Sequence, residues 1–160
     1  SRRDGRRGLM AVKGLADLRR KLKALPQAAK DAATKSVTQG AQEIAAMQQR
    51  LAPVDQGDLK KSIAVTLPGG TTPPYSQPGG ARVAGPFEAI ITAGNSDVRY
   101  AHLVEYGAAP HIAGGIFEGT PHPGAPAQPF FWPAYRALRK RARRRIATGI
   151  KKAIIKKAKS

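Results

Sequence analysis

The side chains best suited to chemistry in this 160-residue chain are three histidines and a few scattered acids. His102 and Glu105 stand three residues apart, and His111 and His122 follow in a stretch rich in glycine, proline and alanine. Imidazoles and carboxylates bind zinc, but a zinc protease needs two histidines one helical turn apart and a further ligand. The sequence meets neither condition, so we expect no metal site, and a half-buried His102 bonded to backbone.

A second group of polar residues lies between 53 and 63. Asp55 and Asp58 suggest a carboxylate pair, yet capping a short helical turn accounts for both, because Asp55 accepts free N–H groups and Asp58 lies near them. Ser62 lacks the Gly-x-Ser-x-Gly setting of a hydrolase nucleophile. The acids are too few and too scattered for a two-metal site. We therefore expect no cofactor and no enzymatic activity; a nuclease or peptidase is the weakest alternative.

The last third of the chain has a different chemistry, which is dense positive charge. Twelve lysines and arginines lie beyond Pro133, no acid follows Glu118, and the whole chain has a net charge of +18. Such a surface attracts polyanions or acidic protein faces. The candidate contacts with a partner or with DNA are Arg136, Arg139, Lys140, Arg141, Arg143, Arg144, Arg145, Lys151, Lys152, Lys156 and Lys157.

The spacing of apolar residues predicts one long helix that carries these charges. Pro133 suits the first turn of a helix, where its missing N–H has no partner. An apolar residue then recurs every four positions, which marks one helix face and not a strand: Leu138, Ala142, Ile146, Ile150 and Ile154. Just before it stands a dense aromatic group, Phe130, Phe131, Trp132 and Tyr135. We interpret this group as the anchor that fixes the helix to the body.

Length and composition limit the number of domains, the size of the core and the kinds of site that are possible. The length indicates one domain, and the abundance of alanine predicts a thin core that is completed by burial in an oligomer. The chain has no cysteine, so disulfides and thiolate metal sites are excluded. No apolar run approaches the roughly 20 residues of a membrane span. We expect a disordered basic extension at 1–9, an α+β domain at 10–135, and 136–160 as its basic C-terminal helix.

Periodicity predicts the remaining elements. Leucines at helical spacing indicate a first helix at about 15–25, which Pro26 ends, and a second follows at about 27–51. Its expected inner face is Ala33, Val37, Ala41, Ile44, Met47 or Gln48, and Leu51. Strands are expected at 62–67 and 87–93, and a short strand or helix at 98–107. The segments 68–86 and 108–128 are two long Gly/Pro-rich loops, the first of them a hairpin extension or a flexible loop.

Three blocks in this order resemble one protein family. They are Pro53-Val54-Asp55-Gln56-Gly57-Asp58-Leu59-Lys60-Lys61-Ser62-Ile63, Tyr100-Ala101-His102-Leu103-Val104-Glu105-Tyr106-Gly107, and Pro126-Ala127-Gln128-Pro129-Phe130-Phe131-Trp132-Pro133-Ala134-Tyr135. The chain resembles the neck or tail-completion proteins of tailed bacteriophages, also described as head–tail joining proteins or minor tail components. Phage-derived gene-transfer particles use similar parts. The resemblance covers about residues 10–155.

This resemblance implies an α+β fold in which two N-terminal helices and a long C-terminal helix pack on a small, mainly antiparallel sheet. It also implies a ring, expected to be a hexamer, between the capsid connector and the tail tube of a particle assembled in the bacterial cytoplasm. No active site is implied. The resemblance implies structural roles for the matching residues, which are Asp55, Gly57, Leu59, Tyr100, His102, Glu105, Gly107, Pro129, Phe130, Phe131, Trp132 and Pro133. Leu103 and Tyr106 are expected to pack in the body as well.

Two functions therefore remain in view. The first is a structural ring subunit with a pore for double-stranded DNA, whose neighbours are connector or stopper and tail terminator or tube proteins. We expect removal of residues 136–160 to leave a soluble body that no longer assembles. The alternative is a stand-alone nucleic-acid-binding protein. Against that alternative, the aromatic residues are bunched at one helix start and are not interleaved with the basic ones, as a base-stacking surface requires.

Overall fold

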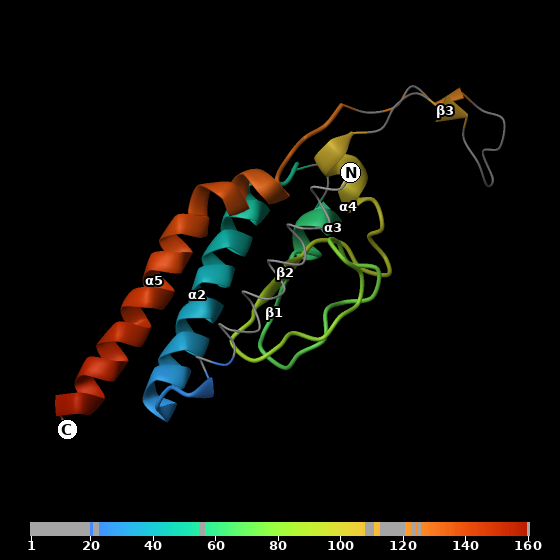
Figure 1. The fold of residues 1–160 in the computed structure, drawn as a ribbon. Coiled ribbons are helices and arrows are strands. Elements are labelled where there is room, and N and C mark those ends of the chain that lie inside the picture. The colour runs from blue at the N-terminus through green and yellow to red at the C-terminus, as the bar shows by residue number, and fades with distance from the viewer. Residues whose placement is uncertain are drawn as a thin grey trace, which may run out of the picture.

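The computed structural model describes residues 20, 23–54, 57–107, 111–112, 121–122, 124 and 126–159. Its body has three layers (Figure 1): the long helix α5 (Phe131–Lys159), the helix α2 (Gln27–Leu51), and a small sheet with its connecting loops. The α+β class is therefore confirmed. The expected extension at 1–9 and most of the expected first helix lie outside the described residues.

Helix α2 has the bounds that the sequence predicts. It begins after Pro26, which has an extended ψ of 152°, and ends at Leu51, with Ala52 as its C-cap just before Pro53. Its buried positions are mostly small: Ala29, Ala33, Ser36, Gly40, Ala41, Ile44, Ala45 and Gln48. Leu51, expected on the inner face, is instead 43% exposed. The helix ends with that residue, so no further turn covers its side chain.

Helices α2 and α5 run antiparallel along each other (Figure 1), and small residues set their close approach. A Cβ atom added at Gly40 would lie 3.0 Å from the Cβ of Ala142, and one added at Gly149 would lie 2.5 Å from the Oγ of Ser36. Glycine costs helix stability of about 1 kcal/mol relative to alanine. Its presence at Gly40 is explained here by the space that the neighbouring helix occupies.

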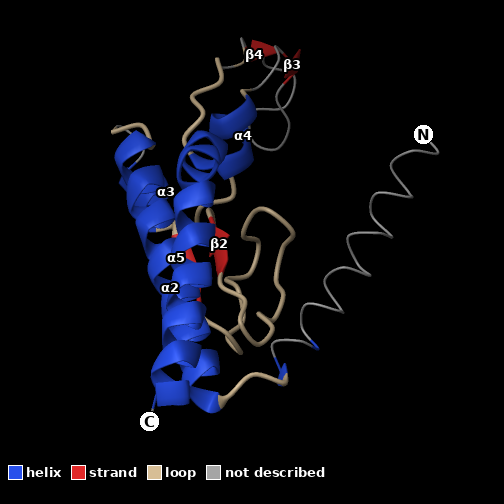
Figure 2. Ribbon diagram, turned by 60° about the vertical axis from the view of Figure 1, so that its left-hand side comes forward, coloured by secondary structure: helices blue, strands red, loops and turns tan. Residues whose placement is uncertain are grey.

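The sheet is smaller than the sequence suggests. β1 (Ala64–Thr66) pairs antiparallel with β2 (Ile90–Thr92), with Val65 opposite Ile91. Both helices of the long pair were expected to pack on this sheet, but α2 makes the principal helical contacts with it, and α5 packs chiefly on α2. Figure 2 shows the same arrangement from another side, with the sheet behind the helix pair. Helix α5 is thus an outer layer, with one long side free of the body.

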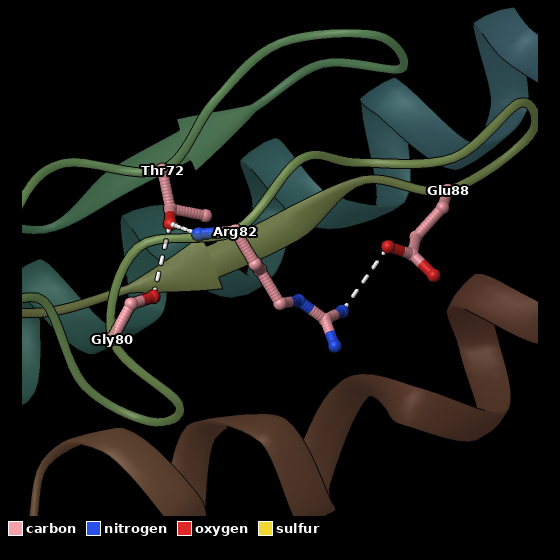
Figure 3. A network of polar contacts seen from close by, with 4 residues as sticks. All are labelled: Thr72, Gly80, Arg82 and Glu88. Carbon is pink, nitrogen blue, oxygen red and sulfur yellow. Dashed lines mark hydrogen bonds and ion pairs between the residues drawn. The ribbon is translucent and has the colours of Figure 1, made fainter.

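The segment 68–86, which showed no periodic pattern, is an ordered hairpin extension between the two strands. Its arms are joined by backbone hydrogen bonds, including Gly69 N to Ala84 O at 2.9 Å and Ala84 N to Gly70 O at 2.8 Å. The buried Thr72 hydroxyl donates to Gly80 O (3.1 Å) and accepts from the N–H of Arg82 (2.8 Å), as Figure 3 shows. The Arg82 guanidinium also reaches the Glu88 carboxylate at 3.1 Å. Of the two readings, the hairpin is confirmed.

The remaining elements are short. α3 (Gly57–Lys61) follows α2, and α4 (Ala101–Tyr106) decides the open choice at 98–107 in favour of a helix. Within the second loop, β3 (His111–Ile112) pairs antiparallel with β4 (Pro121–His122). The main core lies where α2, α3, the sheet, α4 and the start of α5 meet: Ala45, Ala52, Leu59, Ile63, Ala93, Val98, Ala101, Phe130 and Phe131.

Candidate functional site: the seat and the outer face of helix α5

The beginning of α5 is held by a buried carboxylate from another helix. Glu105 of α4 is 6% exposed and accepts hydrogen bonds from the N–H groups of Phe130 (2.8 Å), Phe131 (2.9 Å) and Trp132 (3.1 Å). The first N–H groups of a helix have no partner within it, and negative charge is favourable at that end. Glu105 therefore acts as the N-terminal cap of α5, from 25 residues earlier in the chain.

Aromatic rings surround this cap. Phe130 is 1% exposed and Phe131 7% exposed, and their ring centroids lie 6.3 Å apart in an edge-to-face arrangement. Trp132 stacks edge-to-face on Phe131 at 5.1 Å and on Tyr135 at 5.8 Å. Such pairs add roughly 0.5–1.5 kcal/mol beyond the area that they bury. The rings and the Glu105 carboxylate together form what we call the seat of α5.

Two further polar contacts tie the seat to its neighbours. Gln48 of α2 is fully buried, and its Nε2 donates to the backbone oxygen of Phe131 at 3.2 Å. The indole Nε1 of Trp132 donates to the Tyr106 hydroxyl at 2.7 Å. The seat therefore joins α2, α4 and α5, three elements that are far apart in the sequence.

The other residues with predicted structural roles are spread around this junction. Leu59 is fully buried in α3, and Gly57 opens that helix; Asp55 lies outside the described residues. Tyr100 packs against the core from a partly buried position, and Gly107 ends α4 with a φ of 76°. Pro133 lies in the first turn of α5, while Pro129 before it is exposed. Proline at that place costs no hydrogen bond.

Three expectations for α4 are wrong. His102 is exposed and not half-buried, Leu103 is 44% exposed, and Tyr106 is 67% exposed. The physical reason is that α4 has only six residues and buries just Ala101 and Glu105, four apart on its inner face. Glu105 of this motif is thus inside, while Leu103 and Tyr106 are outside, the opposite of what hydrophobicity predicts.

The basic candidates on α5 fall into two sets. Arg141 and Arg145 turn back to Glu43 of α2, where Arg141 Nε lies 3.7 Å from Glu43 Oε2 and Arg145 forms the closer pair. The other nine are exposed. They are Arg136, Arg139 and Lys140 near the seat, Arg143 and Arg144 in the middle, and Lys151, Lys152, Lys156 and Lys157 toward the end. The sequence did not indicate that Glu43 pairs with Arg141 and Arg145, because no local pattern links it to a helix about 100 residues later.

The apolar stripe of α5 leaves the α2 interface toward the C-terminus. An interval of four residues advances the position by about 40° around an α-helix at each step. Accordingly Leu138, Ala142, Ile146 and Ile150 are partly buried, but Ile154 is 39% exposed and Ile155 44% exposed. Helix α5 is therefore seated at its start and increasingly free at its end.

The seat leaves little room for a substrate. A cavity of about 60 Å³ lies beside Glu105, Tyr106 and Trp132, comparable to a few water molecules. In the described part of the chain, no three His, Cys, Asp or Glu side chains gather as a metal site would require. No helix among the described residues is long and apolar enough to cross a membrane. The arrangement thus presents a buried seat and a charged outer surface.

One comparison with known proteins gives a match. The family model described as "Bacteriophage HK97-gp10, putative tail-component" matches residues 16–107, which include α2, the sheet, the hairpin and α4 with Glu105. The matched part ends before α5. No curated protein and no solved structure matches the chain.

Proposed function

This chain belongs to the bacteriophage HK97-gp10 tail-component family, and on that premise we propose that it is a structural subunit of a phage-like head–tail connection. In this proposal several copies form a ring, expected to be a hexamer, between the capsid connector and the tail tube. The ring surrounds a pore through which double-stranded DNA passes. Its partners are other copies of the chain and the connector, stopper, terminator or tube proteins on either side.

The observation that carries this proposal is apolar surface left uncovered in a chain with a small core. Nine of the sixteen buried apolar residues in the described part are alanines. Large apolar side chains stay exposed where α2 ends and on α4: Leu51 (43%), Val54 (94%), Leu103 (44%) and Tyr106 (67%). Exposed apolar patches mark interaction sites in soluble proteins. A ring would cover such surface between adjacent copies.

The seat supports a structural role better than a catalytic one. Both carboxylate oxygens of Glu105 are engaged by backbone N–H groups, so this buried acid holds a helix in place. A stand-alone nucleic-acid-binding protein would use the basic surface alone and would have no need of uncovered apolar side chains. The two proposals therefore differ in whether the purified chain associates with itself.

The test is the native mass of the purified full-length chain over a range of concentrations, followed by electron microscopy of the neck of the particle. We expect closed rings of one size, with the subunit traceable between connector and tube. A chain that stays monomeric at every concentration, and is absent from the neck of the particle, would contradict the proposal.

A further inference from the structure

The positive charge of the described chain is concentrated in one helix. Helix α5 contains twelve lysines and arginines and no acid. Residues 23–54 and 57–107, by contrast, carry eight basic and six acidic side chains, so their net charge is only +2. Like charges that are close on a helix repel each other. The arrangement thus costs stability in the isolated chain, and a polyanion that neutralises the charges would recover it.

Five of these side chains share the side of α5 that faces away from α2. Lys140 lies three or four residues from Arg136, Arg143 and Arg144, and Lys151 lies seven residues beyond Arg144; these are intervals that repeat on one helix face. All five are exposed: Arg136, Lys140, Arg143, Arg144 and Lys151. We call them the outer basic face. Within the described part of the chain none of the five forms an ion pair, whereas Arg141 and Arg145 do so with Glu43.

We propose that the outer basic face binds the phosphate backbone of duplex DNA without reading its sequence. The inference rests on the proposed function, because it names the ligand of the subunit's charged surface. From Arg136 to Lys151 the outer basic face extends about 22 Å at 1.5 Å per residue. That length is about two thirds of one turn of B-DNA, which is about 34 Å. A face of this length can contact phosphates over about six base pairs, at about 3.4 Å per base pair.

The composition of the end of α5 favours phosphates over an acidic protein surface. Lysine is depleted in protein–protein interfaces, yet five of the last nine residues of α5 are lysines, at 151, 152, 156, 157 and 159, the first of them in the outer basic face. Single strands are also disfavoured, because they are bound by aromatic side chains on which bases stack. The aromatic residues of α5 lie only at its start, where they pack on one another.

The geometry also disfavours a lipid surface. A basic helix binds a membrane by inserting its apolar face between the headgroups. The apolar face of α5 is occupied by α2 over most of its length, as the contacts at Gly40 and Gly149 show. Only the exposed Ile154 and Ile155 near the end would be free for insertion.

The proposal has a quantitative signature in salt. Each phosphate that is neutralised contributes about −0.9 to the slope of log K against log salt concentration. Five contacts predict a slope of about −4.5. The affinity should then fall about 500-fold between 50 and 200 mM salt, and by the same factor for duplexes of unrelated sequence.

The experiment measures binding of fluorescent 12-base-pair duplexes of two unrelated sequences to the full-length chain at several salt concentrations. Two double variants that lose the same amount of charge are compared. The first combines Arg143→Gln and Arg144→Gln on the outer basic face, and the second combines Arg141→Gln and Arg145→Gln beside Glu43. We expect the first pair to reduce the slope by about 1.8 and to weaken binding about 60-fold at 0.1 M salt. The second pair should leave the slope nearly unchanged.

Equal effects of the two pairs would overturn the proposal, because net charge alone would then explain the binding. Tighter binding to anionic vesicles or to an acidic protein than to DNA would overturn it too, as would no binding to duplex DNA at 50 mM salt. The native mass is measured on the same samples. Rings that fail to bind DNA refute only this inference, whereas monomers that bind DNA refute the proposed function.

Discussion

The two ends of helix α5 are built on opposite principles. At the start, Phe130 and Ala134 are almost fully buried, and Glu105 satisfies three backbone N–H groups. At the end, Ile154, Ile155 and the surrounding lysines are exposed. The start therefore contributes to the stability of the subunit, while the end contributes little to it and remains available for other contacts. One continuous helix is thus fixed to the fold at one end and exposed at the other.

This contrast also changes the effect that we expect from removing residues 136–160. From the sequence we expected that a chain without residues 136–160 would remain a soluble body. The structure shows α5 covering the small-residue face of α2, with Gly40 and Ser36 in close contact with Ala142 and Gly149.

The largest effect is therefore expected from that truncation. A chain that ends at residue 135 exposes the buried face of α2 and should lose cooperative unfolding. A chain that ends at residue 150 keeps these contacts and should melt within a few degrees of the full-length chain. Calorimetry of both truncated chains checks the prediction, and equal melting temperatures for the two would show that α5 does not support α2.

The next effect tests the seat itself. Phe130→Ala removes a fully buried aromatic ring and should lower the free energy of unfolding by about 4 kcal/mol. In a chain of this size the melting temperature should fall by about 10 °C. Ile155→Ala, on the exposed end of the same helix, is the control and should stay within about 0.5 kcal/mol of the native chain. Similar losses for the two variants would remove the distinction between the ends.

Glu105→Ala should cost somewhat less, about 3 kcal/mol, because it leaves buried N–H groups of α5 without acceptors. Glu43→Ala removes only partly exposed ion pairs with Arg141 and Arg145, so about 1 kcal/mol or less is expected. Chemical denaturation of both variants makes the comparison. If Glu105→Ala is no more harmful than Glu43→Ala, the carboxylate is not the cap that the geometry indicates.

The smallest effect on stability is expected at the uncovered apolar surface. Val54 is 94% exposed, so Val54→Asp should change the free energy of unfolding by no more than about 0.5 kcal/mol. In the ring it would place a charge in an apolar contact and should block association. Ser96→Asp, on an exposed turn, serves as the control. Native mass measurement decides: if rings of Val54→Asp persist, this surface is not between subunits.

The sequence predicted the helices far better than the side chains that join them. Prolines and periodicity gave the bounds of α2, and Pro133 with the four-residue step indicated α5, because these signals are local. The cap by Glu105 and the pairing of Glu43 with Arg145 depend on contacts across the fold, which no local spacing encodes. The hairpin at 68–86 is fixed by backbone hydrogen bonds, so its side chains show no period.

Amide hydrogen exchange along α5, in the native chain and in Glu105→Ala, tests the central claim most directly. We predict strong protection near the seat, at residues 134–138, that declines through the last two turns. Loss of the cap should speed exchange near the seat by about 160-fold, the equivalent of 3 kcal/mol, and leave the last turns unchanged. Uniform protection along the helix, or equal acceleration at both ends, would contradict the account.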